Sequence, residues 1–169
     1  MTNDPDLCFL GFSLWIDGRQ FPDADDCGEG NWLVVRARME TNGARVECDG
    51  PILMTADIGR FRNRLAVMAE TLKGEAALQP LEPDLKVVLK MQSRGHVEAI
   101  VEITPDHMTQ QHSFTLNADQ TYLPALVASC DAILTRYPIK NTSKMCTTDE
   151  YSALPEGRER LAMGGSCQP

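Results

Sequence analysis

Four carboxylates lie within seven positions near the start of the chain: Asp23, Asp25, Asp26 and Glu29. Carboxylate oxygens bind hard cations such as Ca²⁺, but the EF-hand spacing fails because Cys27 and Val34 occupy two of its ligand positions. The segment has no apolar alternation that could bury it, and burying unpaired like charges is prohibitive. We therefore expect an exposed acidic loop without a metal ion, whose four acids are the candidate partner-binding residues.

The sequence contains no recognisable pattern for catalysis. Nucleophilic catalysis requires a serine or cysteine beside a base, yet there is no GxSxG motif, and His96, His107 and His112 fall in no triad signature. The GxxxxGK[ST] phosphate loop and the HExxH zinc motif are also missing from the sequence. We expect no catalytic residues, no metal site and no cofactor.

The six cysteines do not follow the spacing of zinc or redox motifs, because no two of them are closer than 16 positions. The N-terminus is acidic, whereas a secretory signal begins with basic residues. No segment approaches the roughly 18 consecutive apolar residues that a membrane-spanning helix needs. These observations predict a cytoplasmic protein that does not contact a membrane, with several cysteines present as buried thiols.

The chain carries a net charge of −8, and most of this charge lies in the first third. Residues 1–50 contain ten acids and four bases, whereas the remainder contains fourteen acids and twelve bases. This distribution disfavours nucleic acid as a partner, because phosphates bind basic surfaces. It suits a basic protein partner, although a surface that serves only solubility accounts for the charge as well.

The hydrophobic pattern predicts hairpins of antiparallel strands. Apolar residues that alternate with period two are typical of half-buried strands, and Asn42-Gly43 favours a tight hairpin turn between two of them. The expected strands are 8–16, 32–39, 44–49, 85–91, 96–104 and 112–116. The acidic segment falls in the loop between the first two of these strands.

Two segments, 57–73 and 120–137, have the apolar spacing of amphipathic helices. Their stripes are Ile58, Phe61, Leu65, Met68 and Leu72 in the first, and Leu123, Leu126, Val127, Cys130, Ile133, Leu134 and Tyr137 in the second. Thr55 or Asp57 can cap the first helix, and Thr121 can cap the second. The order strands, helix, strands, helix predicts an α+β fold in which both helices pack on antiparallel sheet. We expect a single domain at 1–140 and a flexible or loosely docked C-terminal tail at 141–169.

The run Gly18-Arg19-Gln20-Phe21-Pro22-Asp23-Ala24-Asp25-Asp26, followed by Asn31-Trp32-Leu33, resembles the opening of WapI-type immunity proteins. In that family the pattern G-x-Q-F-P-D-A-E/D-D precedes an acidic gap, then N-W-L and a strand. Glu82-Pro83-Asp84-Leu85 resembles the family's E-P-x-L, and the end of the second helix at Tyr137-Pro138 resembles the family's end. The resemblance covers about residues 9–139 and leaves the tail outside.

The resemblance implies a role in protecting a bacterial cell. WapI-type immunity proteins are small bacterial proteins that are encoded with polymorphic toxins and protect the producing cell from them. By this resemblance, the chain is a non-enzymatic protein that binds one cognate toxin domain and blocks it. A basic toxin domain would suit the acidic first third through charge complementarity.

Two alternative functions stay open at this point, together with a second candidate binding face. A curved sheet closed by a long helix can enclose an apolar pocket, which would make the chain a small-ligand-binding or enzymatic α+β domain. Alternatively, a free sheet edge would allow self-association as a homodimer. If the acidic loop is not the binding face, the next candidate is the flank of the first helix that carries Arg60 and Arg64.

Overall fold

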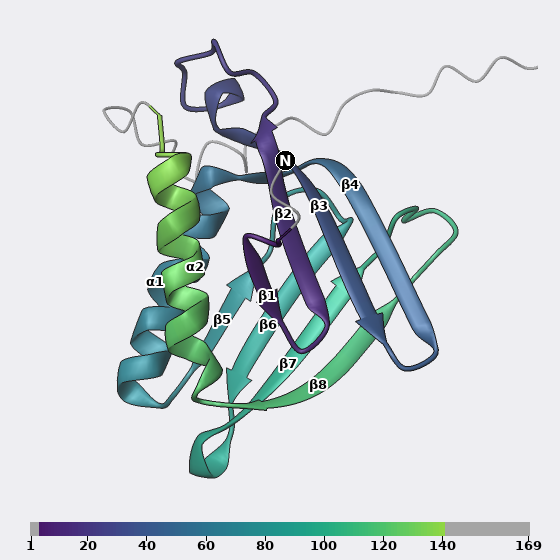
Figure 1. The fold of residues 1–169 in the computed structure, drawn as a ribbon, viewed down its shortest axis with the longest axis vertical. Helices are drawn as coiled ribbons and strands as arrows, with labels where there is room; N and C mark the ends of the chain where they lie inside the picture. Colours follow the sequence, from purple (N-terminus) through teal and green to yellow (C-terminus); the bar gives the residue numbers. More distant parts are fainter. Residues whose placement is uncertain (1–3, 141–169) are drawn as a thin grey trace, which may run out of the picture.

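The structure, a computed structural model, describes residues 4–140. These residues form two antiparallel four-stranded sheets and two helices (Figure 1). The first sheet contains β1 (Leu7–Phe9), β2 (Phe12–Arg19), β3 (Trp32–Thr41) and β4 (Ala44–Met54). The second contains β5 (Glu75–Leu78), β6 (Leu85–Met91), β7 (His96–Ile103) and β8 (Ser113–Asp119). Helix α1 (Thr55–Thr71) follows the first sheet, and α2 (Tyr122–Arg136) follows the second.

The α+β fold and the order strands, helix, strands, helix agree with the prediction. Within each sheet the strands lie side by side in sequence order. The sequence predicted antiparallel strands but did not predict that they would form two separate sheets. In the described residues, α1, with its 17 residues, lies between β4 and β5, and no strand of the first sheet pairs with a strand of the second. The predicted tail at 141–169 lies outside the described residues.

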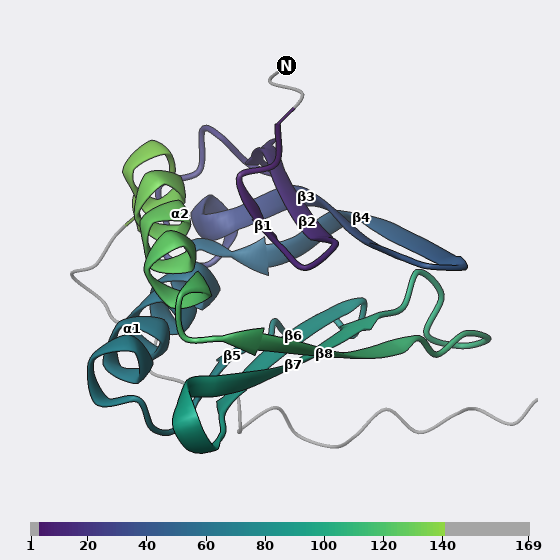
Figure 2. The same ribbon diagram turned by 60° about the horizontal axis from the view of Figure 1, so that its bottom comes forward.

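The two sheets face one another, and both helices lie along one side of them (Figure 2). Alternate residues of each strand point into the space between the sheets. On β3 the predicted inward face is fully buried: Leu33, Val35, Ala37 and Met39. Buried apolar side chains from both sheets and both helices form one hydrophobic cluster. Removing this apolar surface from water is the main stabilising contribution to such a fold.

The first predicted strand, 8–16, is wrong, because the chain forms the hairpin of β1 and β2 there. The chain reverses at Leu10 and Gly11, whose φ values are 47° and 88°. Leucine rarely adopts this left-handed conformation, so the sequence carries no clear turn signal. Glycine is needed next to it, because a Cβ atom on Gly11 would lie 2.2 Å from the carbonyl oxygen of Glu40. The prediction also omits β5, whose four residues are too few for a recognisable alternation.

Helix α1 uses most of the predicted apolar stripe. Four stripe residues are at most 1% exposed: Ile58, Phe61, Leu65 and Met68. Leu72 was predicted to join them, but it adopts a left-handed conformation with φ of 52°, ends the helix and is 44% exposed. At the other end, Asp57 caps the helix as predicted, since its Oδ2 accepts a hydrogen bond from the backbone N–H of Met54 at 2.7 Å.

Helix α2 also packs through its predicted stripe. Its fully buried members are Leu123, Leu126, Cys130 and Ile133. Thr121 precedes the helix as expected, but its hydroxyl donates to the carboxylate of Asp119 and does not cap the helix. Within residues 4–140, no helix has the length and apolar character needed to cross a membrane.

Two cysteines are buried free thiols, as the sequence predicted. Cys48 lies on β4 and Cys130 on α2, and both contribute to the hydrophobic cluster. Burial raises the pKa of each of these thiols to about 12. Both groups therefore stay protonated and act as small apolar side chains. Cys8 on β1 is a free thiol at the surface.

Candidate functional site

The four predicted partner-binding acids lie on the connection between β2 and β3, residues 20–31, which projects beyond the first sheet (Figure 1). We call this segment the acidic loop. All four acids are exposed, as predicted: Asp23, Asp25, Asp26 and Glu29. Phe21 belongs to the same loop and is 40% exposed. The loop therefore presents four carboxylates and one aromatic ring to solvent.

A buried amide holds the base of the acidic loop. Asn31 is 2% exposed, and its Oδ1 accepts hydrogen bonds from the hydroxyl of Thr55 at 2.7 Å and from the backbone N–H of Lys140 at 2.9 Å. Its Nδ2 donates to the carbonyl oxygens of Cys27 at 2.9 Å and Lys140 at 3.1 Å. One side chain thus joins the loop to the first turn of α1 and to the segment after α2.

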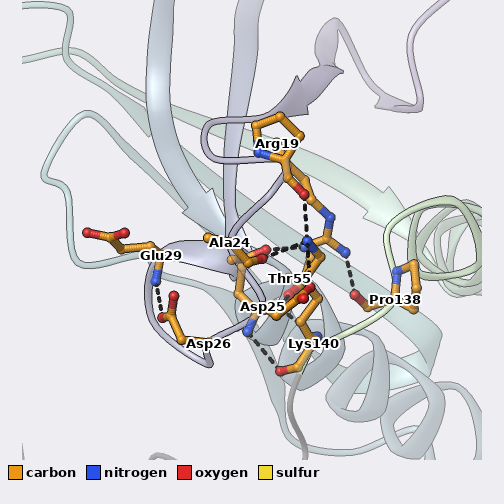
Figure 3. A network of polar contacts seen from close by, with 11 residues as sticks. Arg19, Ala24, Asp25, Asp26, Glu29, Thr55, Pro138 and Lys140 are labelled. Carbon is orange, nitrogen blue, oxygen red and sulfur yellow. Dashed lines mark hydrogen bonds and ion pairs between the residues drawn. The ribbon is translucent and has the colours of Figure 1, made fainter.

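Two cations secure the loop through its backbone (Figure 3). The Nζ of Lys140 donates to the carbonyl oxygens of Pro22 and Ala24, both at 2.7 Å, and lies 3.6 Å from the carboxylate of Asp25. The guanidinium of Arg19 donates to the carbonyl oxygens of Gly30 and Pro138. The segment 138–140 therefore ties the loop to the end of α2, more than 100 positions away in the sequence.

Asp26 and Gly30 shape the loop from within. The Oδ1 of Asp26 accepts hydrogen bonds from the N–H groups of Gly28 at 2.8 Å and Glu29 at 2.7 Å, just where a short 3₁₀ turn (Glu29–Asn31) begins. A Cβ atom on Gly30 would lie 2.5 Å from the carbonyl oxygen of Ala24, so only glycine fits there. Asp26 thus supports the loop conformation while its carboxylate stays exposed.

The exposed carboxylates of the acidic loop offer electrostatic attraction to a partner. In the part of the chain that the structure describes, no three acidic, histidine or cysteine side chains come together to hold a metal ion. A fixed group of exposed carboxylates creates a local negative potential, which attracts basic surfaces.

The second candidate region forms one wall of a groove between α1 and the chain around β5. The groove has a volume of about 450 Å³. It is lined by Asp57, Arg60, Arg64, Glu75, Ala77, Gln79, Pro80 and Leu81. It lies outside the hydrophobic cluster, which fills the space between the sheets and helices.

Asp57 lines this groove and is 6% exposed. Burial raises the pKa of its carboxyl group, while the hydrogen bond from the Met54 N–H and the charge of Arg60 act in the opposite direction. The Oδ1 of Asp57 accepts a hydrogen bond from Arg60. This carboxylate is therefore engaged inside the protein and is not presented to a partner.

The sequence revealed the acids but not the residues that hold them. Asn31, Thr55 and Lys140 come together only in the fold, because the hydrogen bonds of Asn31 reach 24 and 109 positions along the chain. No local spacing encodes such contacts. The only available signal was that Asn31 stands at the end of the acidic segment, directly before a strand.

A known protein family and a solved structure are similar to this chain. The model of the immunity protein WapI-like family matches residues 4–138. A chain in a solved structure described as "CdiA-CT/CdiI toxin and immunity complex from Enterobacter cloacae" shares 13% sequence identity, with a TM-score of 0.41. The alignment covers 72% of this chain and 99% of that chain. No curated protein matches the chain. Since the family match spans nearly all the described residues, the chain belongs to the immunity protein WapI-like family.

Proposed function

We propose that this immunity protein neutralises its cognate toxin domain by binding it directly through the acidic loop. The observation that supports this proposal is that four exposed carboxylates lie on a loop whose backbone is held by Asn31, Lys140 and Arg19. A loop that is already ordered loses little conformational entropy on binding. It can therefore meet a partner surface without first having to fold.

We further propose that the partner surface is basic. Residues 1–50 carry ten acids against four bases, so the charge around the loop is negative beyond the loop itself. Complementary charges accelerate association more than they deepen affinity, and salt weakens this effect. Neutralisation by binding requires no catalytic group, and we place it in the cytoplasm, where the toxin would act on the producing cell.

The neighbouring genes should identify the toxin partner, and restoration of growth on co-expression tests whether the chain neutralises it. The genes beside this one should encode a large secreted protein with a variable C-terminal domain, and that domain should arrest growth when expressed alone. Co-expression of the immunity protein should restore growth, and the two proteins should co-elute in size-exclusion chromatography. A toxin domain that is neither neutralised nor bound would refute the proposed function.

The role of the loop is tested by neutralising three of its acids. We expect Asp25→Asn, Asp26→Asn and Glu29→Gln together to slow toxin association by about tenfold at low salt and to flatten its salt dependence. An asparagine at 26 keeps an oxygen acceptor for the two backbone N–H groups, so the loop should keep its shape.

A matched control removes the same charge elsewhere. The triple variant Glu40→Gln, Glu70→Gln and Glu82→Gln also changes three exposed acids, but none of them lies in the acidic loop. It should slow association much less than the loop variant does. Equal effects from the two variants would show that only the net charge matters and would place the binding face elsewhere.

The oligomeric state is part of the same proposal. Strands β1, β4, β5 and β8 lie at the edges of the two sheets, and each pairs with one strand within the described residues. Such edges can pair with a second copy of the chain. Sedimentation equilibrium distinguishes a monomer from a homodimer, and the measured mass of the toxin complex gives the number of immunity chains in it.

A further inference from the structure

The groove between α1 and β5 has two walls of different character. Arg60 and Arg64 lie one turn apart on the flank of α1. The facing wall includes Ala77 on β5 and Leu81 just after it. Leu81 is 61% exposed, which makes it one of the most exposed large apolar side chains among the described residues. Two guanidinium groups thus stand opposite an accessible apolar surface.

The acids of the groove are already paired, and one arginine is not. Asp57 accepts hydrogen bonds from Met54 and Arg60, and Glu75 lies 3.9 Å from the Nζ of Lys90 on the neighbouring strand. Arg64 makes no ion pair or hydrogen bond within residues 4–140. The lining holds two acids and two arginines, and within the described residues Arg64 is therefore the charged group of this lining that has no ion-pair partner.

The apolar surface continues along the same flank of α1. Val67 lies three positions after Arg64, so it is on the same side of the helix one turn further on. It is 57% exposed. Val67 thus adds exposed apolar surface on the side of α1 that carries Arg64, while Ala77 and Leu81 line the groove together with Arg64. A planar guanidinium in such surroundings suits a carboxylate, which it can bind through two parallel hydrogen bonds.

We infer that this groove binds an acidic side chain of the toxin domain, flanked by an apolar residue that packs on Leu81. This inference rests on the proposed function only in taking the toxin as the partner. It predicts that the toxin surface carries both signs of charge, since the acidic loop selects a basic region and the groove an acidic one. The two regions meet at the first turn of α1, where Thr55 supports the loop and Asp57 lines the groove.

Charge reversal at Arg64 tests the inference on the toxin complex. Because Arg64 is exposed and unpaired within the described residues, Arg64→Glu should leave the melting temperature unchanged while weakening toxin affinity by at least about tenfold. Arg94→Glu, in the turn between β6 and β7, makes the same charge change outside the groove lining and should have little effect. A toxin complex that tolerates Arg64→Glu as well as Arg94→Glu would overturn the inference.

A second measurement does not depend on the toxin. The peptide acetyl-Leu-Glu-Leu-amide should shift the amide NMR signals of Arg64, Ala77 and Leu81 in the full chain, with millimolar affinity. The matched peptide acetyl-Leu-Gln-Leu-amide, and the Arg64→Gln variant, should show no such shifts. If the glutamate peptide leaves these signals unmoved, the groove does not bind carboxylates. If the peptide binds but the wild-type chain forms no toxin complex, the inference about the groove chemistry stands and the proposed function fails.

Discussion

Substitution of Asn31 by alanine should loosen the acidic loop and destabilise the whole protein. The Asn31 side chain takes part in four hydrogen bonds, which join the loop, the first turn of α1 and the segment after α2. Alanine removes all four at once and leaves their partners behind. The most costly of these is the hydroxyl of Thr55, which is fully buried and has no water to replace the lost acceptor.

The expected cost follows from the groups that are left unpaired. A buried polar group without a partner costs about 1–3 kcal/mol, whereas a group near the surface recovers most of this by hydration. Thr55 belongs to the first class, and the backbone groups of Lys140, at a half-buried position, belong largely to the second. We therefore expect a loss of about 2–4 kcal/mol in the free energy of unfolding. For a chain of this size, that corresponds to a melting temperature lower by about 5–15 °C.

Urea unfolding measures this loss directly. The urea midpoint of Asn31→Ala should fall while the slope of the transition stays unchanged, because the variant and the wild-type chain expose the same surface on unfolding. In the variant, hydrogen exchange should quicken at the backbone amides of Gly28 and Glu29, which in the wild-type chain donate hydrogen bonds to Asp26. The control is Asn63→Ala at an exposed position of α1, which should change stability by less than about 0.5 kcal/mol. If Asn31→Ala is no more destabilising than Asn63→Ala, the buried amide does not organise the loop.

Three further outcomes follow from the structure. Phe61→Asp places a charge in the fully buried core and should unfold the chain, as circular dichroism would reveal; a folded variant would refute the packing of α1. We propose that the domain ends near 140, so truncation after Asn141 should change the melting temperature by less than about 3 °C. Truncation after Tyr137 also removes Pro138 and Lys140, which hold the acidic loop, and should lower the free energy of unfolding as much as Asn31→Ala does. In the folded chain Cys8 should react with a thiol reagent at about pH 8, while Cys130 should react only on unfolding; equal rates would contradict its burial.

The parts of the fold that sequence reasoning predicted are those with strong local periodicity. On β3 four alternate apolar residues face the core, and on α1 four residues at helical spacing do the same. The two-residue turn at Asn42-Gly43 joins β3 and β4 as its composition indicated. In each case the local preference and the tertiary packing favour the same structure, so the local pattern was sufficient.

The parts that were predicted wrongly are those where tertiary contacts overrule local preference. Leu10 and Leu72 both adopt positive φ angles that leucine disfavours, and each lies where the chain changes direction. Leu10 packs against the hydrophobic cluster, which offsets part of the strain. Nothing in the neighbouring residues encodes this compensation. For the same reason the division into two sheets could not be foreseen from the strands alone.

The candidate site also contains features that the sequence shows and features that only the fold brings together. The four acids of the loop were visible because charge density is a property of the sequence, and their exposure follows from the cost of burying like charges. The groove beside Arg60 and Arg64 was visible only as a helix flank, since β5 was not predicted and the facing wall was therefore missing. The buried amide of Asn31 was invisible, because its partners are remote in the sequence.

The way in which the loop is held bears on how it can function. Four like charges in one short loop repel each other, and nearby cations reduce this repulsion. Lys140 and Arg19 supply them, yet their hydrogen bonds go to backbone carbonyl oxygens and not to the carboxylates. The positive charges thus reduce the repulsion without occupying the acidic groups, and even Asp25 keeps a 96% exposed side chain at 3.6 Å from Lys140. Asp26 is the exception, since its carboxylate also accepts two backbone hydrogen bonds within the loop. Because Asn31, Lys140 and Arg19 provide the other supporting contacts, we propose that Asp23, Asp25 and Glu29 can change to suit a different toxin while the loop keeps its shape.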